Sequence, residues 1–277
     1  MAFDSSVAIP FFRAQGAGND FLFSWRHELP PIANLPAMAR AICHRNFGVG
    51  GDGWYLMSKS PTADAAIHLY NSDGSEAELS GNGTRCAAAV LVEAGYTIGD
   101  LVRIETGAGL RELHQTARLG SEYHFEMGMG RPVVQDVHFA LPLDRGSLDV
   151  TLIDVGNPQC AVELTALGET SFAFDWQTLG AEIEAHQHFP RRSNVSFFYK
   201  TAANAIEARF FERGAGATLS SGTGATGAAV AAKALALVNS PITVRTEAGN
   251  LQVRWQGADV FLTGPAQVIA RGEYYPS

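Results

Sequence analysis

Two stretches of the chain are apolar on nearly every side of a helix. Thr84–Ala94 and Gly224–Val238 consist largely of Ala, Val and Leu and contain few charged residues. A surface helix keeps a polar face, so this pattern predicts two buried helices. Two further helices are predicted over Leu35–Arg45 and Asp175–His186.

Most other apolar positions alternate with polar ones or are β-branched, and turn residues bound each run. This pattern is typical of short strands. The predicted strands are Ala66–Tyr70, Leu101–Thr106, Tyr123–Met127, Val150–Val155, Ala161–Leu164, Val195–Tyr199, Ala205–Phe211, Ile242–Thr246, Leu251–Trp255 and Val260–Gly264. Helices and strands together predict an α+β fold.

The chain contains an internal repeat. The string SGNGTRCAAAV begins at Ser80, and SGTGATGAAVA begins at Ser221, 141 residues later. Weaker echoes at nearly the same spacing join Thr106 to Thr246 and Gly18-Asn19 to Gly156-Asn157. Three echoes in one order indicate a duplication.

The duplication predicts two pseudo-symmetric domains that join near Arg131-Pro132. We expect an N-terminal domain over residues 1–130, with residues 265–277 packing back on it, and a C-terminal domain over residues 131–264. Each domain is expected to be a curved, mostly antiparallel sheet around one central helix.

Composition and charge exclude several classes of protein. The 277 residues include 28 acidic and 20 basic ones, and no basic patch stands out, so we expect no nucleic-acid partner. No apolar run reaches the roughly 18 residues that span a bilayer. The first residues lack the pattern of a secretory signal. We therefore expect a cytoplasmic protein without a membrane partner.

The cysteines are few and scattered. Cys43, Cys86 and Cys160 have no spacing typical of a disulfide framework or a zinc site, which fits a reducing compartment and predicts no metal. Cys86 lies six residues beyond Ser80, about one and two-thirds helical turns away, so we expect it to be a buried structural thiol.

In both halves a Ser-Gly-x-Gly string runs directly into the predicted buried helix. Free backbone N–H groups at the start of a helix form an anion site, commonly for phosphate or carboxylate. The alternative is that the serines only cap the helices and the glycines only permit close packing. A third loop, Gly48–Gly53, matches G-x-G-x-x-G, but a helix precedes it where a dinucleotide site needs a strand.

Several strings, in order along residues 16–224, resemble the diaminopimelate epimerase family. The matching strings are Gly16-Ala17-Gly18-Asn19-Asp20-Phe21, Arg45-Asn46-Phe47-Gly48-Val49-Gly50-Gly51-Asp52-Gly53, Asn71-Ser72-Asp73-Gly74-Ser75-Glu76, Ser80-Gly81-Asn82-Gly83-Thr84-Arg85-Cys86, Gly156-Asn157-Pro158, Asn194-Val195, Glu212-Arg213-Gly214-Ala215-Gly216 and Ser221-Gly222-Thr223-Gly224. Together they form a specific signature.

The resemblance implies a cofactor-independent racemase or epimerase of lysine and cell-wall biosynthesis. It implies a small amino dicarboxylate as substrate, no metal, and a two-domain fold that can form a homodimer. It also implies that the helix-end residues Gly81, Asn82, Gly222 and Thr223 hold the reacting carboxylate. The residues implied at the far end of the substrate are Asn19, Asn71, Asn157, Asn194 and Arg213.

The sequence departs from the family at the reacting groups. Family members use one cysteine in each domain to move the α-proton, and here Ser80 and Ser221 hold both positions. The family's usual histidine after Gly-Asn-Pro is Gln159. A thiol has a pKa near 8.5, whereas a serine hydroxyl is nearly never ionised without an adjacent base. Gln159 cannot supply that base, so Glu212 is the candidate helper.

The candidate catalytic set is therefore Ser80, Ser221, Glu212 and Gln159, and three interpretations stay open. The protein epimerises through a polarised serine pair, it catalyses a different proton-transfer isomerisation, or it binds an amino acid without turnover. A fourth is that the serines were engineered to trap a ligand.

Overall fold

The computed structural model describes residues 8–77, 80–97, 99–144 and 146–276 of the chain. The chain divides into two compact units. Unit 1 is Met1–Met127 with Gly264–Ser277, and unit 2 is Gly128–Thr263. The chain passes between the units within strands β8 (Glu122–Gly130) and β17 (Asp259–Tyr274).

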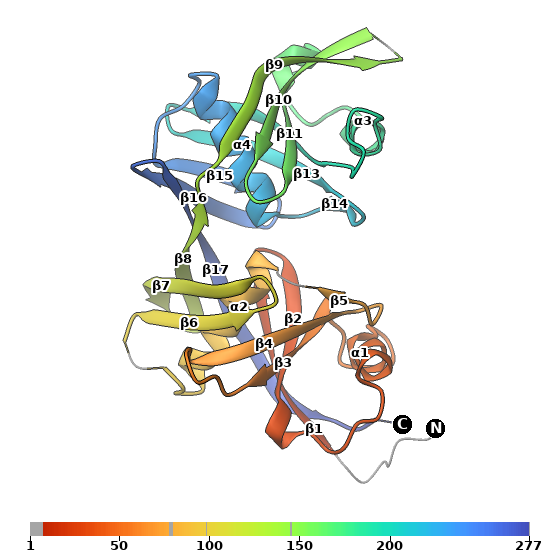
Figure 1. The fold of residues 1–277 in the computed structure, drawn as a ribbon, viewed down its shortest axis with the longest axis vertical. Helices are drawn as coiled ribbons and strands as arrows, with labels where there is room; N and C mark the ends of the chain where they lie inside the picture. The colour runs from red at the N-terminus through yellow and green to blue at the C-terminus, as the bar shows by residue number, and fades with distance from the viewer. Residues whose placement is uncertain (1–7, 78–79, 98, 145, 277) are drawn as a thin grey trace. The chain divides into compact units, whose positions relative to one another are not determined.

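Unit 1 is built mainly from strands around one buried helix (Figure 1). Its other elements are β1 (Ile9–Gly16), β2 (Asn19–Trp25), the 3-10 helix η1 (Arg26–Glu28), α1 (Leu35–Cys43), β3 (Gly53–Ser58), β4 (Ala65–Asn71), β5 (Glu76–Ala77), α2 (Gly81–Glu93), β6 (Leu101–Thr106) and β7 (Gly109–Leu119).

Unit 2 is also built mainly from strands around one helix, and Figure 1 shows α4 (Gly222–Ala234) enclosed by its strands. Its other elements are β9 (Val133–Leu143), β10 (Gly146–Asp154), β11 (Pro158–Glu163), the 3-10 helix η2 (Leu164–Leu167), α3 (Trp176–Glu184), β12 (Asn194–Ala202), β13 (Ala205–Glu212), β14 (Gly216–Thr218), β15 (Ile242–Thr246) and β16 (Gly249–Gln256).

Strand pairing repeats in the same order in the two units. In unit 1, β1–β2 is antiparallel, β2–β3 parallel, β3–β4 antiparallel, β4–β6 parallel and β6–β7 antiparallel. In unit 2, the corresponding series β10–β11, β11–β12, β12–β13, β13–β15 and β15–β16 has the same orientations. The α+β fold with an internal duplication is therefore confirmed.

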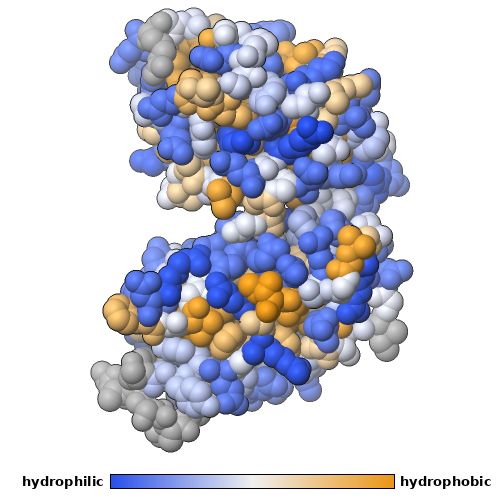
Figure 2. Space-filling model, turned by 180° about the vertical axis from the view of Figure 1, so that it is seen from behind, coloured by the Kyte–Doolittle hydropathy of each residue, from blue (hydrophilic) through white to orange (hydrophobic). Residues whose placement is uncertain are grey.

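The central helices are buried, and most of their side chains are small. In α2, residues 82–91 are all buried, and in α4, residues 224–232 are all buried. Small side chains let neighbouring strands approach the helix backbone. A β-carbon placed on Gly16 of β1 would lie 3.0 Å from Cys86 Sγ and 3.2 Å from the Asn82 carbonyl oxygen. On the face shown in Figure 2, apolar residues form small groups among polar ones on each unit.

The predicted helices are present, but their ends differ from the prediction. Both central helices begin directly after their serines, and α4 ends at Ala234 rather than Val238. Ala236 has a φ of 56°, and its N–H bonds back to the Lys233 carbonyl, which ends the helix in a left-handed turn. The helix predicted to reach Arg45 ends at Cys43.

The sequence prediction missed several strands. Strands β2 and β3 are buried at nearly every position, so they lack the alternation that marks a half-buried strand. Strands β7 and β9 are mostly exposed and carry mixed polar side chains. Among the described residues, no helix is long and apolar enough to cross a membrane.

Candidate active site

Each serine is the N-cap of the central helix in its unit. Ser80 Oγ accepts a hydrogen bond of 3.2 Å from the Gly83 N–H, and Ser221 Oγ accepts one of 3.1 Å from the Gly224 N–H. The capping role considered from the sequence is thus real. It leaves the first N–H groups of each helix without intrahelical partners, at the positive end of the helix dipole. Capping and anion binding are therefore compatible here.

In unit 2 a carboxylate lies against the serine. The Ser221 hydroxyl donates to Glu212 Oε2 over 2.7 Å, and Thr218 Oγ1 donates to Glu212 Oε1 over 2.7 Å. Ser221 is only 3% exposed. A carboxylate that accepts a hydroxyl proton can act as its base. The fold thus brings together two residues of the predicted catalytic set.

Unit 1 has a different arrangement around its serine. Asn71 follows Tyr70 as the last residue of β4, and Glu212 is the last residue of β13, at the same 141-residue offset that separates Ser80 from Ser221. The Asn71 amide donates to Ser75 Oγ over 2.9 Å. An amide cannot accept a proton as a carboxylate does, so position 71 cannot serve as a base.

A chain of side-chain hydrogen bonds supports the start of α2. Asn82 donates to Asn19 Oδ1 over 2.8 Å, and Asn19 donates to Asp52 over 3.0 Å. Behind them, Arg85 donates to Asn82 Oδ1 over 2.5 Å. These contacts orient Asn19 and Asn82, two residues predicted to bind substrate.

Arg85 is a functional candidate that the sequence analysis did not single out. The side chain is fully buried, and its Nη1 has no hydrogen-bond partner within the described residues. Burial lowers the pKa of Arg85 to about 10, which leaves the guanidinium charged at neutral pH. A buried cation behind Asn82 favours a bound anion at this helix end. Its only sequence signal is an arginine inside an otherwise apolar helix.

The loop Gly48–Gly53 closes the end of α1. The N–H groups of Val49 and Gly50 both donate to the Ile42 carbonyl. These amides are used within the fold, which agrees with the sequence argument against a dinucleotide site. Nearby, Arg45 binds Asp20 over 2.7 Å and Asp52 over 2.8 Å.

Asp20 is the buried carboxylate of this network. Burial by itself would raise its pKa, but the hydrogen bonds and charges of Arg45 and Arg13 outweigh burial and hold the pKa below its usual value. The ionised Asp20 and Arg45 keep Asp52, and through it Asn19, in place. Asp52 and Asp20, which both occur in the matching strings, are therefore supporting residues to which the sequence assigned no role.

In unit 2 the predicted substrate residues also form hydrogen-bonded groups. Gln159 donates to Asn157 Oδ1 over 2.7 Å, and Asn157 donates to Thr223 Oγ1 over 3.4 Å. Gln159 is buried, and a β-carbon placed on Gly227 of α4 would lie 3.1 Å from its side chain. Gln159 therefore links strand β11 to α4 and orients Asn157.

Asn194 and Arg213 form a separate group. Asn194 donates to the Pro158 carbonyl over 3.2 Å and accepts a hydrogen bond of 3.0 Å from the Arg213 backbone N–H. The Arg213 guanidinium is exposed and donates to the Arg191 carbonyl. The hydrogen bonds of Asn71, Asn194 and Arg213 thus lead to residues other than the two serines.

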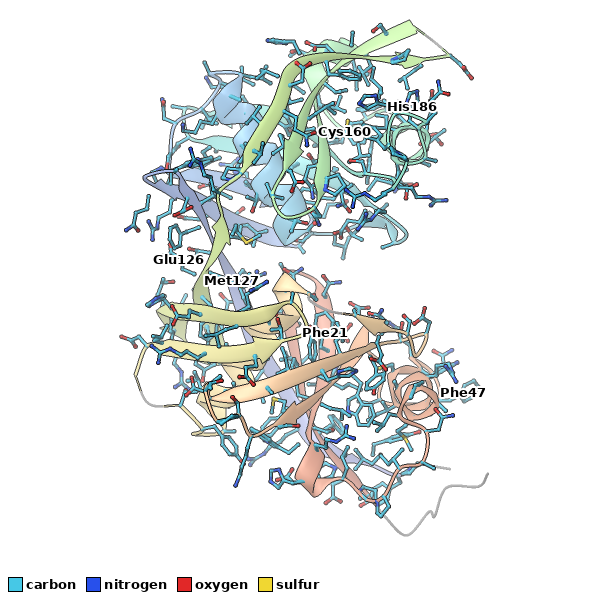
Figure 3. The ribbon with its side chains drawn as sticks, viewed as in Figure 1. Phe21, Phe47, Glu126, Met127, Cys160 and His186 are labelled. Carbon is cyan, nitrogen blue, oxygen red and sulfur yellow. The ribbon has the colours of Figure 1, made fainter. Side chains whose placement is uncertain are left out.

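The cysteines offer no replacement for the family's thiol pair. All three are free and buried (Cys160 is labelled in Figure 3). Burial raises the pKa of Cys43 and of Cys86 to about 12. A thiol needs a lowered pKa to react as a thiolate near neutral pH. The expectation that Cys86 is buried is confirmed.

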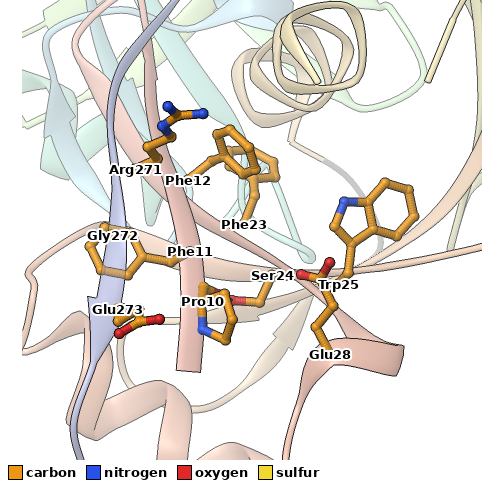
Figure 4. A pocket seen from close by; sticks show the side chains of 10 residues that line it. All are labelled: Pro10, Phe11, Phe12, Phe23, Ser24, Trp25, Glu28, Arg271, Gly272 and Glu273. Atoms are coloured by element: carbon orange, nitrogen blue, oxygen red, sulfur yellow. The ribbon is translucent and has the colours of Figure 1, made fainter. Parts of the chain in front are cut away.

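A cavity of about 380 Å³ on unit 1 lies apart from the predicted site residues (Figure 4). Its walls include Phe12, Phe23, Trp25 and Arg271, and none of its lining residues belongs to the predicted site. Within the part of the chain that the structure describes, no group of three or more His, Cys, Asp or Glu residues is placed to hold a metal ion.

Comparison with known proteins identifies the family. The family model for diaminopimelate epimerase matches residues 11–134 and 151–269. The diaminopimelate epimerase of Pelotomaculum thermopropionicum is 36% identical over 279 residues, covering 95% of this chain and 98% of the relative. That of Desulfitobacterium hafniense is 34% identical, covering 94% and 96%.

Solved structures share the fold at low sequence identity. A phenazine biosynthesis protein of the PhzF family from Bacillus anthracis has a TM-score of 0.70 at 15% identity, covering 96% of this chain and 99% of that one. A hydroxyproline epimerase from Agrobacterium vitis has a TM-score of 0.68 at 18% identity, covering 99% and 93%. With the family match and the curated relatives, the conclusion is that this chain belongs to the diaminopimelate epimerase family and to the isomerase class.

Proposed function

We propose that the protein is a cofactor-independent epimerase of an amino dicarboxylic acid, with diaminopimelate as the first substrate to test. The proposed proton-transfer groups are one serine in each unit. Ser221 and Glu212 form the base, and Ser80 is the hydroxyl of the second half-site. The curated relatives named diaminopimelate epimerase support the substrate class.

The hydrogen bond from Ser221 to Glu212 carries this proposal. A serine hydroxyl alone is too weak an acid to replace a thiol. At 2.7 Å, Glu212 can take the hydroxyl proton while the oxygen takes the α-proton. General acid–base steps of this kind contribute about 10²- to 10⁴-fold each. The pair therefore supplies chemistry that Ser221 lacks by itself.

The substrate carboxylate is proposed to lie at the helix starts. Backbone N–H groups at Gly81 and Asn82 in unit 1, and at Gly222 and Thr223 in unit 2, suit an anion. The buried Arg85 adds positive charge on the unit 1 side. Stabilising the carboxylate also stabilises the negative charge that develops when the α-proton leaves.

The cellular setting belongs to the same proposal. Three free, buried thiols are compatible with a reducing cytoplasm. A small amino dicarboxylate is the proposed partner, since the helix starts and the surrounding amides suit its charged ends. No cofactor enters the proposed proton transfer.

Deuterium uptake at the α-carbon tests the proposal. The purified protein is incubated with L,L-diaminopimelate in D₂O, and the α-proton signal is followed by NMR. The control is the double variant Ser80→Ala with Ser221→Ala. We expect uptake by the wild-type protein and loss of uptake in the control. Uptake that persists in the control would show that other groups move the proton.

A second measurement separates failure of chemistry from failure of binding. Calorimetric titration with L,L-diaminopimelate reports binding without turnover. Binding without uptake would contradict the epimerase proposal and point to an amino-acid-binding protein. Neither binding nor uptake would point to an isomerase with another substrate.

A further inference from the structure

We infer that Tyr55 is a positioning residue for Ser80: its phenol stays protonated and donates a hydrogen bond to the Ser80 oxygen during the reaction. The inference rests on the proposed function, because it assigns the group that completes the unit 1 half-site. It gives the two half-sites different roles, with Ser80 as proton donor and Ser221 with Glu212 as proton acceptor.

The Tyr55 ring is fixed against the start of α2. It stacks on Phe23 with ring centres 5.0 Å apart and meets Phe21 edge-on at 5.4 Å (Phe21 is labelled in Figure 3). A β-carbon placed on Gly83 would lie 2.1 Å from the Tyr55 hydroxyl oxygen. The N–H of the same Gly83 donates to Ser80 Oγ. The phenol thus reaches the helix turn that holds Ser80.

The phenol hydroxyl is buried without a hydrogen-bond partner in the structure. Tyr55 is 1% exposed, and its hydroxyl has no hydrogen-bond partner within the described residues. Burial of an unpartnered hydroxyl is unfavourable. Packing alone therefore does not explain why this position carries a hydroxyl.

The duplicated unit shows that packing does not need the hydroxyl. Tyr55 pairs across strands with Leu69, and the same offset leads to the pair Ser196 and Phe210 in unit 2. There the aromatic ring comes from the other strand, and a β-carbon placed on Gly224 would lie 2.7 Å from Phe210. Either ring can fill this space beneath the helix start, but only the unit 1 ring carries a proton to donate.

The electrostatics make Tyr55 a donor. Burial raises the pKa of its phenol well above the usual range, the nearby Cys86 adds to the rise, and Ser80 opposes it. A phenol that stays protonated donates a hydrogen bond and cannot act as a base near neutral pH. Ser80 Oγ then accepts from Gly83 and from Tyr55, which leaves its own proton for the substrate. Ser221 differs, because its hydroxyl donates a hydrogen bond to Glu212.

The proton transfers balance over one turnover. The C–H bond at the α-carbon breaks, its proton goes to Ser221 Oγ, and the Ser221 proton goes to Glu212. The Ser80 O–H bond breaks as its proton forms the new C–H bond, and the Tyr55 phenol donates a hydrogen bond to the Ser80 oxygen that is left. Ser80 then takes a proton from water, and Glu212 loses its proton to water. In the reverse reaction each proton retraces this path.

The first test compares two phenol deletions. Tyr55→Phe keeps the ring that packs between Phe21 and Phe23, and Tyr123→Phe is the matched control. Tyr123 is also a buried tyrosine of unit 1, but its hydroxyl donates to Glu93. We expect Tyr55→Phe to slow α-deuterium uptake about 10²-fold, with unchanged substrate affinity by calorimetry. An uptake rate equal to that of Tyr123→Phe would overturn the inference.

A second test does not depend on turnover. Tyrosine labelled with ¹³C at Cζ reports the hydrogen bonding and ionisation of the phenol, and Tyr55→Phe assigns the Tyr55 signal. We expect Ser80→Ala to shift the Tyr55 signal, while Ser221→Ala leaves it in place. An unchanged Tyr55 chemical shift in Ser80→Ala would overturn the inference.

The two tests separate this inference from the proposed function. If the wild-type protein shows no deuterium uptake, the proposed epimerase fails, and the ¹³C signal alone decides whether Tyr55 bonds to Ser80. If uptake occurs and neither Tyr55→Phe nor Ser80→Ala has its expected effect, the epimerase stands and the role of Tyr55 is wrong.

Discussion

The two units keep the same backbone at the helix start but surround it with different chemistry. Ser80 and Ser221 cap α2 and α4 through the same contact, to the N–H three residues on. Glu212 accepts a hydrogen bond from the Ser221 hydroxyl, whereas Asn71 occupies the same repeat position in unit 1. The comparison teaches that duplication preserved the backbone at the helix start, while the side chains beside the two serines diverged.

The largest expected effect on the reaction rate comes from removing the base beside Ser221 in unit 2. Glu212→Gln retains the shape and a hydrogen-bond acceptor but removes the base. We expect α-deuterium uptake to fall about 10²- to 10⁴-fold, measured by NMR in D₂O. Glu207→Gln, on the same strand β13 but bonded to Tyr199 and Arg209, is the control. A loss as large in Glu207→Gln would mean that the strand, rather than the base, is disturbed.

A smaller effect compares the packing beneath the two helix starts. In Gly83→Ala the new β-carbon would meet the Tyr55 hydroxyl at 2.1 Å, and in Gly224→Ala it would meet Phe210 at 2.7 Å. Overpacking typically costs about 1–3 kcal/mol. We expect both variants to lose stability in urea unfolding, with the greater loss in Gly83→Ala because its clash is closer. A greater loss in Gly224→Ala would contradict the rigid placement of Tyr55.

The smallest expected effect is a difference in pKa between cysteines placed at the two serine positions, which reports the charge beside each serine. A cysteine at a helix N-terminus has a lowered pKa, but a neighbouring carboxylate opposes ionisation. We therefore expect a lower thiol pKa in Ser80→Cys than in Ser221→Cys, by about one unit, which corresponds to about 1.4 kcal/mol. The pH dependence of iodoacetamide alkylation measures it. The wild-type protein is the control, since Cys43, Cys86 and Cys160 are buried.

Equal thiol pKa values in the two variants would contradict the assigned asymmetry. The same two changes made together restore the family's cysteine pair. A large gain in epimerase activity in that double variant would show that the rest of the site still suits the reaction. Absence of a gain would show that Gln159 also has to change.

Local pattern allowed much of the secondary structure to be predicted. The β6 and β15 predictions have the observed ends, because alternation and turn residues act over a few positions. Strands β2 and β3 were missed because burial on both faces removes alternation. The predicted C-terminal end of the helix 224–238 was wrong, because a left-handed turn at Ala236 ends the helix early. An alanine in the sequence gives no signal for such a turn.

The site residues, like the strands, include some that the sequence predicted and some that it did not. The repeat was enough to point to the two serines and the helix-end glycines, and the family resemblance named Glu212 as a candidate helper. They did not predict Arg85, Asp52 or Tyr55 as neighbours of the site, because each depends on burial or on contact across strands. Arg85 carries no family-independent signal beyond its charge, and its lack of a partner is visible only within the folded unit.

The sequence by itself determined the duplication, the two capped helices, the family and the loss of both thiols, because these follow from residue identity and short-range pattern. Only the tertiary structure decided which side chains meet. Asn19 and Asn82 are joined across 63 residues, and Tyr55 reaches the helix turn of Ser80 from a neighbouring strand. Strand register and buried volume select those contacts, and neither is encoded by the residues on one side of a contact alone.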